Sequence, residues 1–312
     1  MSGNISMYTD LAINESASVF LMVLTCLQVI LGSVANFIVI FIILKSRELT
    51  KRSEDRLILN LAFADFLALT TFVPLHIYVL WQGKISIGIQ RIYEALNSLV
   101  VYYGGNAVMS IACDRFVAVL LPLRHWTLIS KRVTFVMVSL TLFVAVILAI
   151  VDYVSPDLTQ ESRKLLIKTI FIPYNVLFCS VLAILYSFIL YSTLKQARQI
   201  ARQRRSIGVS FSNYQGRLFV KTILKITLLV VLYYATYLPL SIYVLVYSNL
   251  VENQQRIVQA TARCWLYSFL FLNCCANPYV YALQTARFKI AFYKTFPISF
   301  RLKANKTAVI AT

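Results

Sequence analysis

The stretch Ser110–Leu123, SIACDRFVAVLLPL, decides the fold that this sequence predicts. An acid and a base, Asp114 and Arg115, stand side by side near the end of a long apolar run, and Pro122 follows one apolar turn later. Ionised side chains inside a bilayer cost several kcal/mol, so they are retained where they pair with one another or serve a function. The stretch therefore indicates the aqueous end of a membrane helix that carries a functional ion pair.

The composition of the whole chain agrees with a membrane protein. Of its 312 residues 59% are hydrophobic and 13% are charged, and the mean hydropathy is +0.73. Soluble proteins average about 25% charged residues. The net charge of +18 would suggest nucleic acid as the partner of a soluble protein. Here the bases lie between apolar segments, which favours anionic membrane lipid as their partner and excludes nucleic acid.

A transmembrane helix needs about 20 mostly apolar residues, and the sequence contains seven such spans. They cover residues 18–44, 57–80, 91–120, 133–154, 167–194, 222–247 and 260–283, and the longest connection is 195–221. Each span is expected to be helical, because lipid offers no partner for free backbone groups. None shows the alternation of a membrane β-barrel strand. We predict an all-α membrane protein with a seven-transmembrane helix bundle.

The distribution of basic residues predicts the orientation. If the amino terminus lies outside, the segments facing the cytoplasm hold 23 of the 30 Lys and Arg residues, as the positive-inside rule requires. Two glycosylation sequons, at Asn4 and Asn14, favour the same orientation. We expect a multi-pass plasma-membrane protein with an extracellular segment 1–17, a membrane domain 18–283 and a cytoplasmic tail 284–312.

The tail begins with ARFKIAFYKTF, residues 286–296, in which aromatic and basic residues interleave. Such a pattern is typical of a short amphipathic helix that lies on the membrane surface. No cysteine follows it, so a palmitoyl anchor is not expected.

Polar residues in the middle of apolar spans are functional candidates. Asn36, Asp65, Asn273 and Asn277 fall within spans one, two and seven, and a rise of about 1.5 Å per residue places three of them, Asn36, Asp65 and Asn277, at similar depth. One carboxylate among several amides suggests a buried polar cluster and a candidate sodium site. A purely structural hydrogen-bond network is the alternative.

Together these features resemble the rhodopsin-like (class A) G-protein-coupled receptors over nearly the full chain. The motifs that carry the resemblance stand in the family's order on the seven spans. They are Asn36, the run Leu61-Ala62-Phe63-Ala64-Asp65, the triplet Asp114-Arg115-Phe116, the pair Pro122-Leu123, Pro239 in span six, and Asn277-Pro278-Tyr279-Val280-Tyr281 in span seven.

The resemblance implies a signalling mechanism. Arg115 would be held by Asp114 at rest and would meet a heterotrimeric G protein once helix six swings outward. Tyr186 and Tyr281 would then support it. Pro239 would kink helix six, with Tyr237 at the place of the family's tryptophan toggle and Tyr233 one turn deeper; plain aromatic packing is the alternative for Tyr237.

Several departures from the family pattern are informative. Gln90 occupies the usual disulfide position on helix three, and residues 152–167 contain no cysteine. Phe219 stands where many members have an acid that clasps Arg115, so we expect a weak resting lock and measurable basal signalling. Gly104 replaces a serine near Asp65, which weakens the case for sodium.

The resemblance also implies a ligand pocket among the outer halves of helices three, five, six and seven. Its candidate residues are Glu94, Asn97, Val101, Tyr102, Tyr174, Leu240, Ser241, Tyr267 and Phe271. Asn97 replaces the aspartate of amine receptors, and Glu94 either serves a cation or is an exposed rim acid. Residues 260–283 contain no lysine, so retinal is not expected. Small-molecule, peptide and chemosensory ligands stay open.

Two other classes are disfavoured. A secondary transporter would show broken helices and several intramembrane charges, and Asp65 is the clearest such charge here. For an intramembrane enzyme or a metal site the chain offers only His76 and His125, without ligand spacing, and both are expected at helix ends or in loops. The six cysteines are expected to be small buried side chains. We therefore expect neither an enzyme nor a bound metal.

Overall fold

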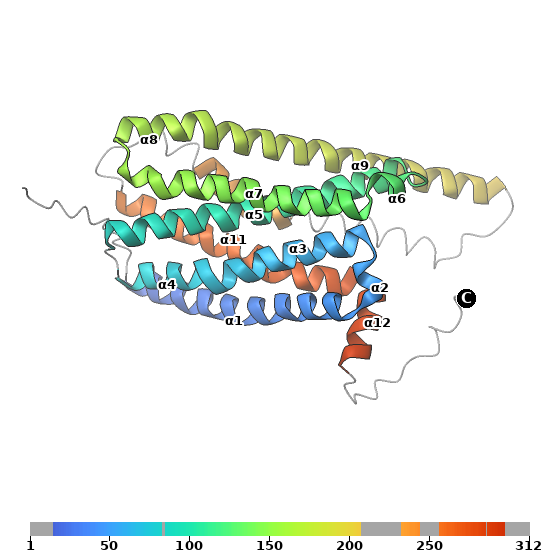
Figure 1. Ribbon diagram of the computed structural model, residues 1–312, viewed down its shortest axis with the longest axis horizontal. Coiled ribbons are helices and arrows are strands. Elements are labelled where there is room, and N and C mark those ends of the chain that lie inside the picture. The colour runs from blue at the N-terminus through green and yellow to red at the C-terminus, as the bar shows by residue number, and fades with distance from the viewer. Residues whose placement is uncertain (1–14, 83–84, 207–231, 244–255, 285, 297–312) are drawn as a thin grey trace, which may run out of the picture.

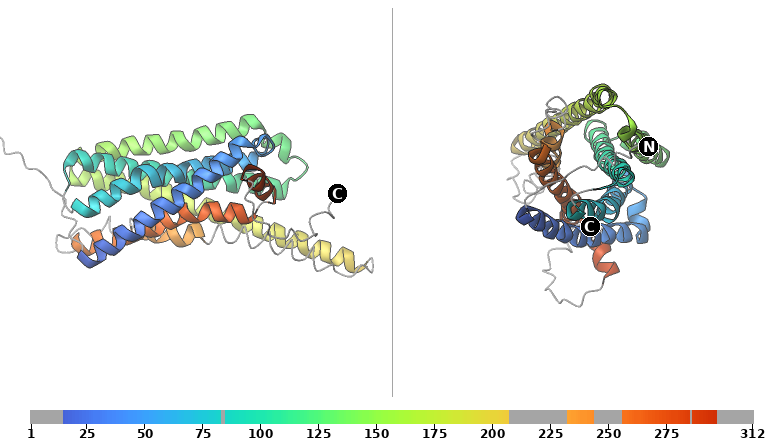
Figure 2. Two further views of the ribbon diagram at one scale, coloured as in Figure 1. Left: turned by 90° about the horizontal axis from the view of Figure 1, so that it is seen from below. Right: turned by 90° about the vertical axis from the view of Figure 1, so that its left-hand side faces the viewer.

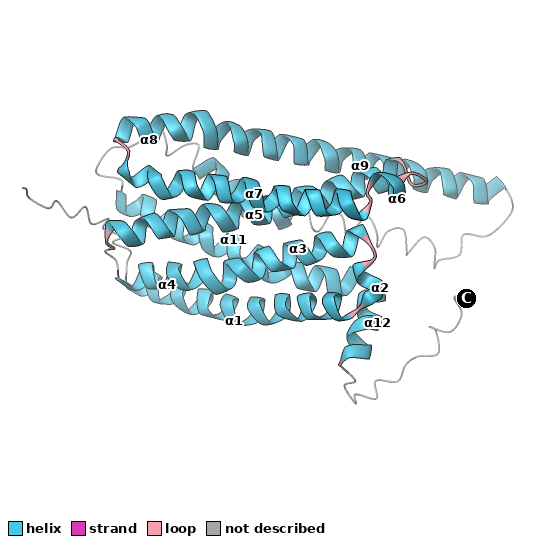
Figure 3. Ribbon diagram, in the orientation of Figure 1, coloured by secondary structure: helices cyan, strands magenta, loops and turns pink. Residues whose placement is uncertain are grey.

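The computed structural model describes all residues except 1–14, 83–84, 207–231, 244–255, 285 and 297–312. Within the described residues every regular element is a helix and none is a strand, and the long helices lie side by side in an elongated bundle (Figure 1; Figure 3). The amino-terminal helix α1 begins at the end of the bundle opposite to α12 (Figure 1). The all-helical class predicted from the sequence is confirmed.

Most helices correspond to the predicted spans with slightly wider bounds. Spans one, three, four and seven are α1 (Glu15–Lys45), α5 (Ile87–Leu120), α7 (Lys131–Val154) and α11 (Arg256–Gln284). Span two consists of α3 (Ser53–Leu67), a π-helical turn (Ala68–Phe72) and α4 (Val73–Gln82). Of span six the structure describes residues 232–243, which are helical.

The fifth span is longer than predicted. Helix α8 (Gln160–Leu166), a π-helical turn (Ile167–Phe171) and α9 (Ile172–Ser206) run on without interruption, and α9 projects beyond the bundle (Figure 2). The prediction of a loop from residue 195 was wrong, because the basic run after Leu194 continues the helix into water. Short helices complete the described chain: α2 (Arg47–Thr50), α6 (His125–Leu128), the 3-10 turn Ser155–Asp157, and α12 (Ala286–Thr295).

Four segments among the described residues are long and apolar enough to cross a membrane on those grounds alone. They are Val19–Lys45, Ser53–Gln82, Lys131–Asp157 and Glu161–Gln196. Helices α5 and α11 mix polar side chains such as Asn106 and Asn277 with apolar ones. Helix α5 packs against α3, α7 and α9, so its polar groups lie toward other helices.

Large apolar side chains cover the outside of the bundle. Phe135 on α7 is 72% exposed and Phe37 on α1 is 55% exposed, whereas Phe72 and Leu57 are completely buried. In a soluble protein such a large exposed apolar surface would mark an interaction site. In a membrane bundle it is the side expected to face lipid.

Two sequence-based expectations about packing were wrong. His76 is not at a helix end: it lies within α4, is 1% exposed, and its Nδ1 is 2.9 Å from the hydroxyl of Tyr93. Aromatic rings of Phe72 and Phe271 surround it. The cysteines are all free, but only Cys264 is buried; Cys26 is exposed on α1, and the other four are partly exposed.

Candidate functional site

The end of the bundle that carries α2 and α6 contains the predicted ion pair, near the end of α5. Arg115 Nη2 lies 2.9 Å from Asp114 Oδ2 and 2.9 Å from Glu54 Oε2, a residue at the start of α3. Arg115 therefore has two carboxylate partners. Glu54 is a partner that sequence analysis missed, and its position one turn before the apolar part of span two was the available signal.

Asp114 is fixed from three directions. Besides its contact with Arg115, its Oδ1 accepts a hydrogen bond from Ser53 Oγ at 2.7 Å and lies 3.0 Å from His125 Nε2 of α6. Its side chain is 1% exposed. Burial of a carboxylate is costly unless it is hydrogen-bonded and paired, so α6 and the start of α3 hold the acid of the predicted switch in place.

Of the two tyrosines predicted to support the switch, the structure describes the side chain of Tyr186. Tyr186 on α9 is 7% exposed. The rings of Phe116 and Phe188 meet edge to face at 6.3 Å, which joins α5 to α9. The side chain of Tyr281 lies outside the described residues.

The four polar residues of the membrane interior belong to one region but form no single network. Asn277 Nδ2 donates to Asp65 Oδ2 at 2.8 Å. Asn36 Nδ2 instead donates to the backbone carbonyls of Gly32 and Cys274, so it ties α1 to α11 without reaching Asp65. Asn273 is 8% exposed.

A small cavity adjoins this cluster. Asp65, Asn273 and Gly104 contribute to its lining, and its volume of about 30 Å³ is close to the share of one water molecule. Within the described residues no group of three or more His, Cys, Asp or Glu side chains could hold a metal ion.

The described part of helix six presents a stacked tyrosine pair. The rings of Tyr233 and Tyr237 lie 5.1 Å apart at 19°, and both residues are buried. The Tyr237 hydroxyl donates a short hydrogen bond to Asn175 Oδ1 on α9. Pro239 follows two residues later on the exposed side. Tyr237 thus connects residues 232–243 to α9.

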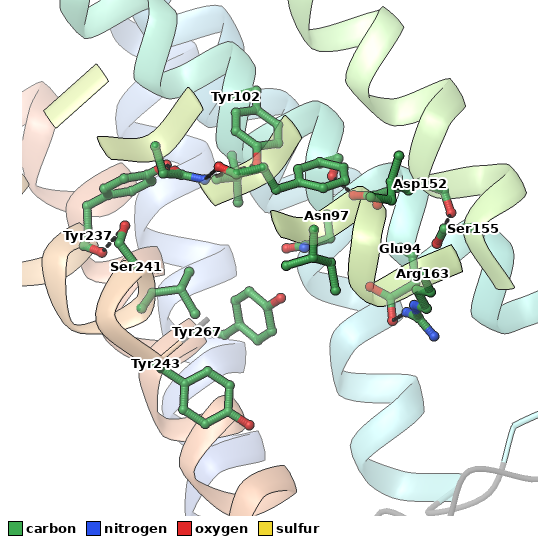
Figure 4. Close-up of a pocket in the computed structure, with 17 residues that line it drawn as sticks. Glu94, Asn97, Tyr102, Asp152, Ser155, Arg163, Tyr237, Ser241, Tyr243 and Tyr267 are labelled. Atoms are coloured by element: carbon green, nitrogen blue, oxygen red, sulfur yellow. Dashed lines mark hydrogen bonds and ion pairs between the residues drawn. The ribbon is translucent and has the colours of Figure 1, made fainter. Parts of the chain in front are cut away.

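The half of the bundle away from Arg115, named the outer half in contrast to the inner end at Arg115, contains a pocket of about 230 Å³ (Figure 4). Residues from α5, α7, α8, α9, helix six and α11 line it. Seven of the nine candidates named from the sequence are among them: Glu94, Asn97, Val101, Tyr102, Leu240, Ser241 and Tyr267.

Tyr174 and Phe271 do not line this pocket. The Tyr174 hydroxyl donates to Asn106 Oδ1 at 2.6 Å, and its ring packs edge to face on Tyr102, behind the pocket wall. Phe271 is 1% exposed and lines the deeper cavity beside Asp65 instead. Helical position gave the correct face of each helix but not the depth of these two side chains.

The pocket also contains charged residues that sequence analysis missed. Asp152, at the outer end of α7, and Arg163, on α8, lie on the same side as Glu94 (Figure 4). Arg163 Nη2 is 3.6 Å from Glu94 Oε1, and Glu94 is only 13% exposed, so Glu94 is not an exposed rim acid. An acid within the apolar span 133–154 was the signal that could have identified Asp152.

Comparison with known families decides the class of this bundle. The family model of the seven-transmembrane receptors of the rhodopsin family matches residues 35–281. The chain belongs to this family. Membership implies the seven-span bundle and a multi-pass plasma-membrane location, and rhodopsin-family members are receptors rather than enzymes.

Individual rhodopsin-family relatives are distant. Galanin receptor 2b of Danio rerio is 25% identical over an alignment of 313 positions, which covers 94% of this chain and 79% of that receptor. Protein trapped in endoderm-1 of Drosophila melanogaster is 24% identical, over 91% and 79% of the two chains. Octopamine receptor beta-2R of Chilo suppressalis is 28% identical over 132 residues, 40% of this chain and 33% of that receptor.

Proposed function

We propose that this rhodopsin-family receptor binds an extracellular ligand in the outer pocket and activates a heterotrimeric G protein through Asp114, Arg115 and Phe116. The observation that carries the proposal is the guanidinium of Arg115, which stands between two carboxylates at the inner end of the bundle. Its side chain is 27% exposed, so a partner that approaches this end could contact it.

Ligand binding would act by shifting a population. A ligand that binds the open form more tightly than the closed form raises the open fraction, and only the difference in affinity counts. Tyr237 lines the pocket and contacts α9 through Asn175. A ligand that displaces this contact would loosen the described part of helix six from α9, and the movement of helix six would uncover Arg115.

The topology belongs to the same proposal. The inner end would face the cytoplasm, and the amino terminus, with Asn4 and Asn14 as glycosylation sites, would face outward; both asparagines lie outside the described residues. Helix α12 carries exposed Arg287, Lys289 and Lys294, and it would lie on the inner membrane surface against anionic lipid. Asp65 would provide a candidate sodium site, and no retinal or other cofactor is required.

The decisive experiment is guanine-nucleotide exchange on purified G-protein heterotrimers by the receptor in lipid nanodiscs. We expect exchange above that of empty nanodiscs, and Arg115→Ala should abolish the excess while surface expression is retained. Arg124→Ala is the matched control, because Arg124 is an exposed base outside the ion pairs described here. Undiminished exchange by the Arg115 variant would contradict the proposal.

A further inference from the structure

The charges of the outer pocket are not balanced. Two acids, Glu94 and Asp152, face one base, Arg163. Arg163 is paired with Glu94 at 3.6 Å. Among the described residues, no basic nitrogen lies within 4.0 Å of Asp152, whose Oδ2 accepts a short hydrogen bond from Ser98 Oγ. Within the described part of the chain this carboxylate therefore has a hydroxyl partner but no ion pair of its own, and Arg163, the base in the pocket lining, pairs with Glu94.

The pocket also contains one buried hydrogen-bond acceptor that is not satisfied by the described residues. The Tyr237 hydroxyl donates to Asn175 Oδ1, and Asn175 Nδ2 donates to the Phe171 carbonyl at 2.8 Å and to the Tyr102 hydroxyl at 3.3 Å. Asn97 Oδ1, in contrast, is a buried acceptor without a hydrogen-bond partner among the described residues. One unsatisfied acceptor in the same pocket as an excess negative charge favours a ligand that brings a donor and positive charge.

The opposite side of the pocket suits the remainder of such a ligand. Tyr237, Tyr243 and Tyr267 lie across from Asp152, and Asn97 lies between the two sides (Figure 4). Aromatic faces attract cations and pack against apolar groups. The volume of about 230 Å³ is below the 300–1,000 Å³ that is usual for pockets of drug-sized ligands, so the ligand part bound here is small.

We propose that the outer pocket binds a small organic cation, with Asp152 on α7 as the counter-ion, Asn97 Oδ1 as a second acceptor and the facing tyrosines against its aromatic or apolar part. Glu94 does not serve as the counter-ion, because Arg163 already occupies it. This inference rests on the proposed receptor function only in placing the ligand in this pocket.

Binding can be tested without a G protein. The receptor in lipid nanodiscs is heated with 2-phenylethylamine, N-acetyl-2-phenylethylamine or phenylacetate, which share an aromatic ring and differ in charge. We expect the amine alone to raise the melting temperature in a saturable way. Asp152→Asn, which retains an acceptor for Ser98, should raise the amine concentration for half-maximal stabilisation at least tenfold, and Ser98→Ala should raise it less.

Asp157→Asn is the matched control, because Asp157 lies five residues further on, outside the pocket lining, and pairs with Arg91. It should leave amine binding unchanged. The inference is overturned if the amine gives no shift up to 10 mM, if the neutral or anionic probe stabilises equally well, or if Asp152→Asn binds the amine as tightly as the native chain.

Nucleotide exchange in the same nanodiscs separates the two proposals. Asp152-dependent amine binding without any exchange on the tested G proteins would support the cation site and count against the proposed coupling. If nucleotide exchange depends on Arg115 but the amine does not raise the melting temperature, the result would support coupling and overturn the cation site.

Discussion

Arg115 on α5 forms a 2.9 Å ion pair with Glu54 on α3, at the inner end of the bundle. The sequence indicated that the family's usual acid on helix six is replaced by Phe219, which lies outside the described residues. In the described structure Arg115 instead pairs with Glu54 of α3, which belongs to span two, and with its own neighbour Asp114 on α5. This clasp would survive an outward movement of helix six, because neither carboxylate belongs to that helix.

Glu54→Gln should therefore raise basal nucleotide exchange about 1.4- to fivefold, because a partly exposed ion pair contributes only ~0.2–1 kcal/mol. The side chains of Arg115 and Glu54 are 27% and 33% exposed. The measurement is exchange without added ligand, normalised to surface expression. Glu48→Gln is the control, since Glu48 is an exposed acid of α2. Equal basal rates in the two variants would show that Glu54 does not restrain Arg115.

Tyr237→Phe should alter signalling more than Tyr234→Phe. Both hydroxyls tie helix six to α9: Tyr237 donates to Asn175, and Tyr234 donates to the Cys179 carbonyl at 2.7 Å. Removal of either hydroxyl loses one part-buried hydrogen bond and should cost about 0.5–1.5 kcal/mol of stability. Only Tyr237 lines the pocket, so it alone should also change basal exchange. If the Tyr237→Phe and Tyr234→Phe variants had the same exchange rate, Tyr237 would have a role in packing only.

Asp65→Asn should weaken the coupling between ligand and G protein. The variant retains an oxygen that can accept from Asn277 Nδ2, now 2.8 Å from Asp65, but it loses the negative charge. Exchange at saturating ligand should fall while surface expression is unchanged. Comparing sodium with potassium chloride in both proteins tests the cation site, because only the native carboxylate can attract the ion. An unaltered dose response would mean that Asp65 is purely structural.

Gly32→Ala should lower the melting temperature of the purified receptor. A Cβ atom at Gly32 would lie 2.6 Å from both Cys275 Sγ and Leu69 Cδ1, and such overpacking typically costs about 1–3 kcal/mol. Gly104→Ala is the matched control within a helix, since nothing lies within 4 Å of its added Cβ. It should be neutral or gain up to ~1 kcal/mol from helix propensity. A tolerated Gly32 variant would mean that the side chains of Cys275 and Leu69 can rotate aside or that α1 can shift away from them.

Much of the inner end could be predicted from sequence because its signals are local. Two signals could be read directly from the chain: the adjacent charges of Asp114 and Arg115 at a span boundary, and the amides within apolar runs. Charged and polar groups are costly in lipid, so they are candidates for function. The same logic could have identified Asp152, which lies within the predicted span 133–154. It was missed because no motif marked it.

By itself the sequence determined the helical class, the membrane-crossing segments and the ion pair of Asp114 with Arg115, because length, hydropathy and adjacency are properties of the chain. Only the tertiary structure decided which distant partners meet. Glu54 reaches Arg115, Arg163 pairs with Glu94, and Asp152 has no ion pair among the residues that the structure describes. These pairings depend on how the helices are rotated and how deep each side chain lies, and packing between helices sets both.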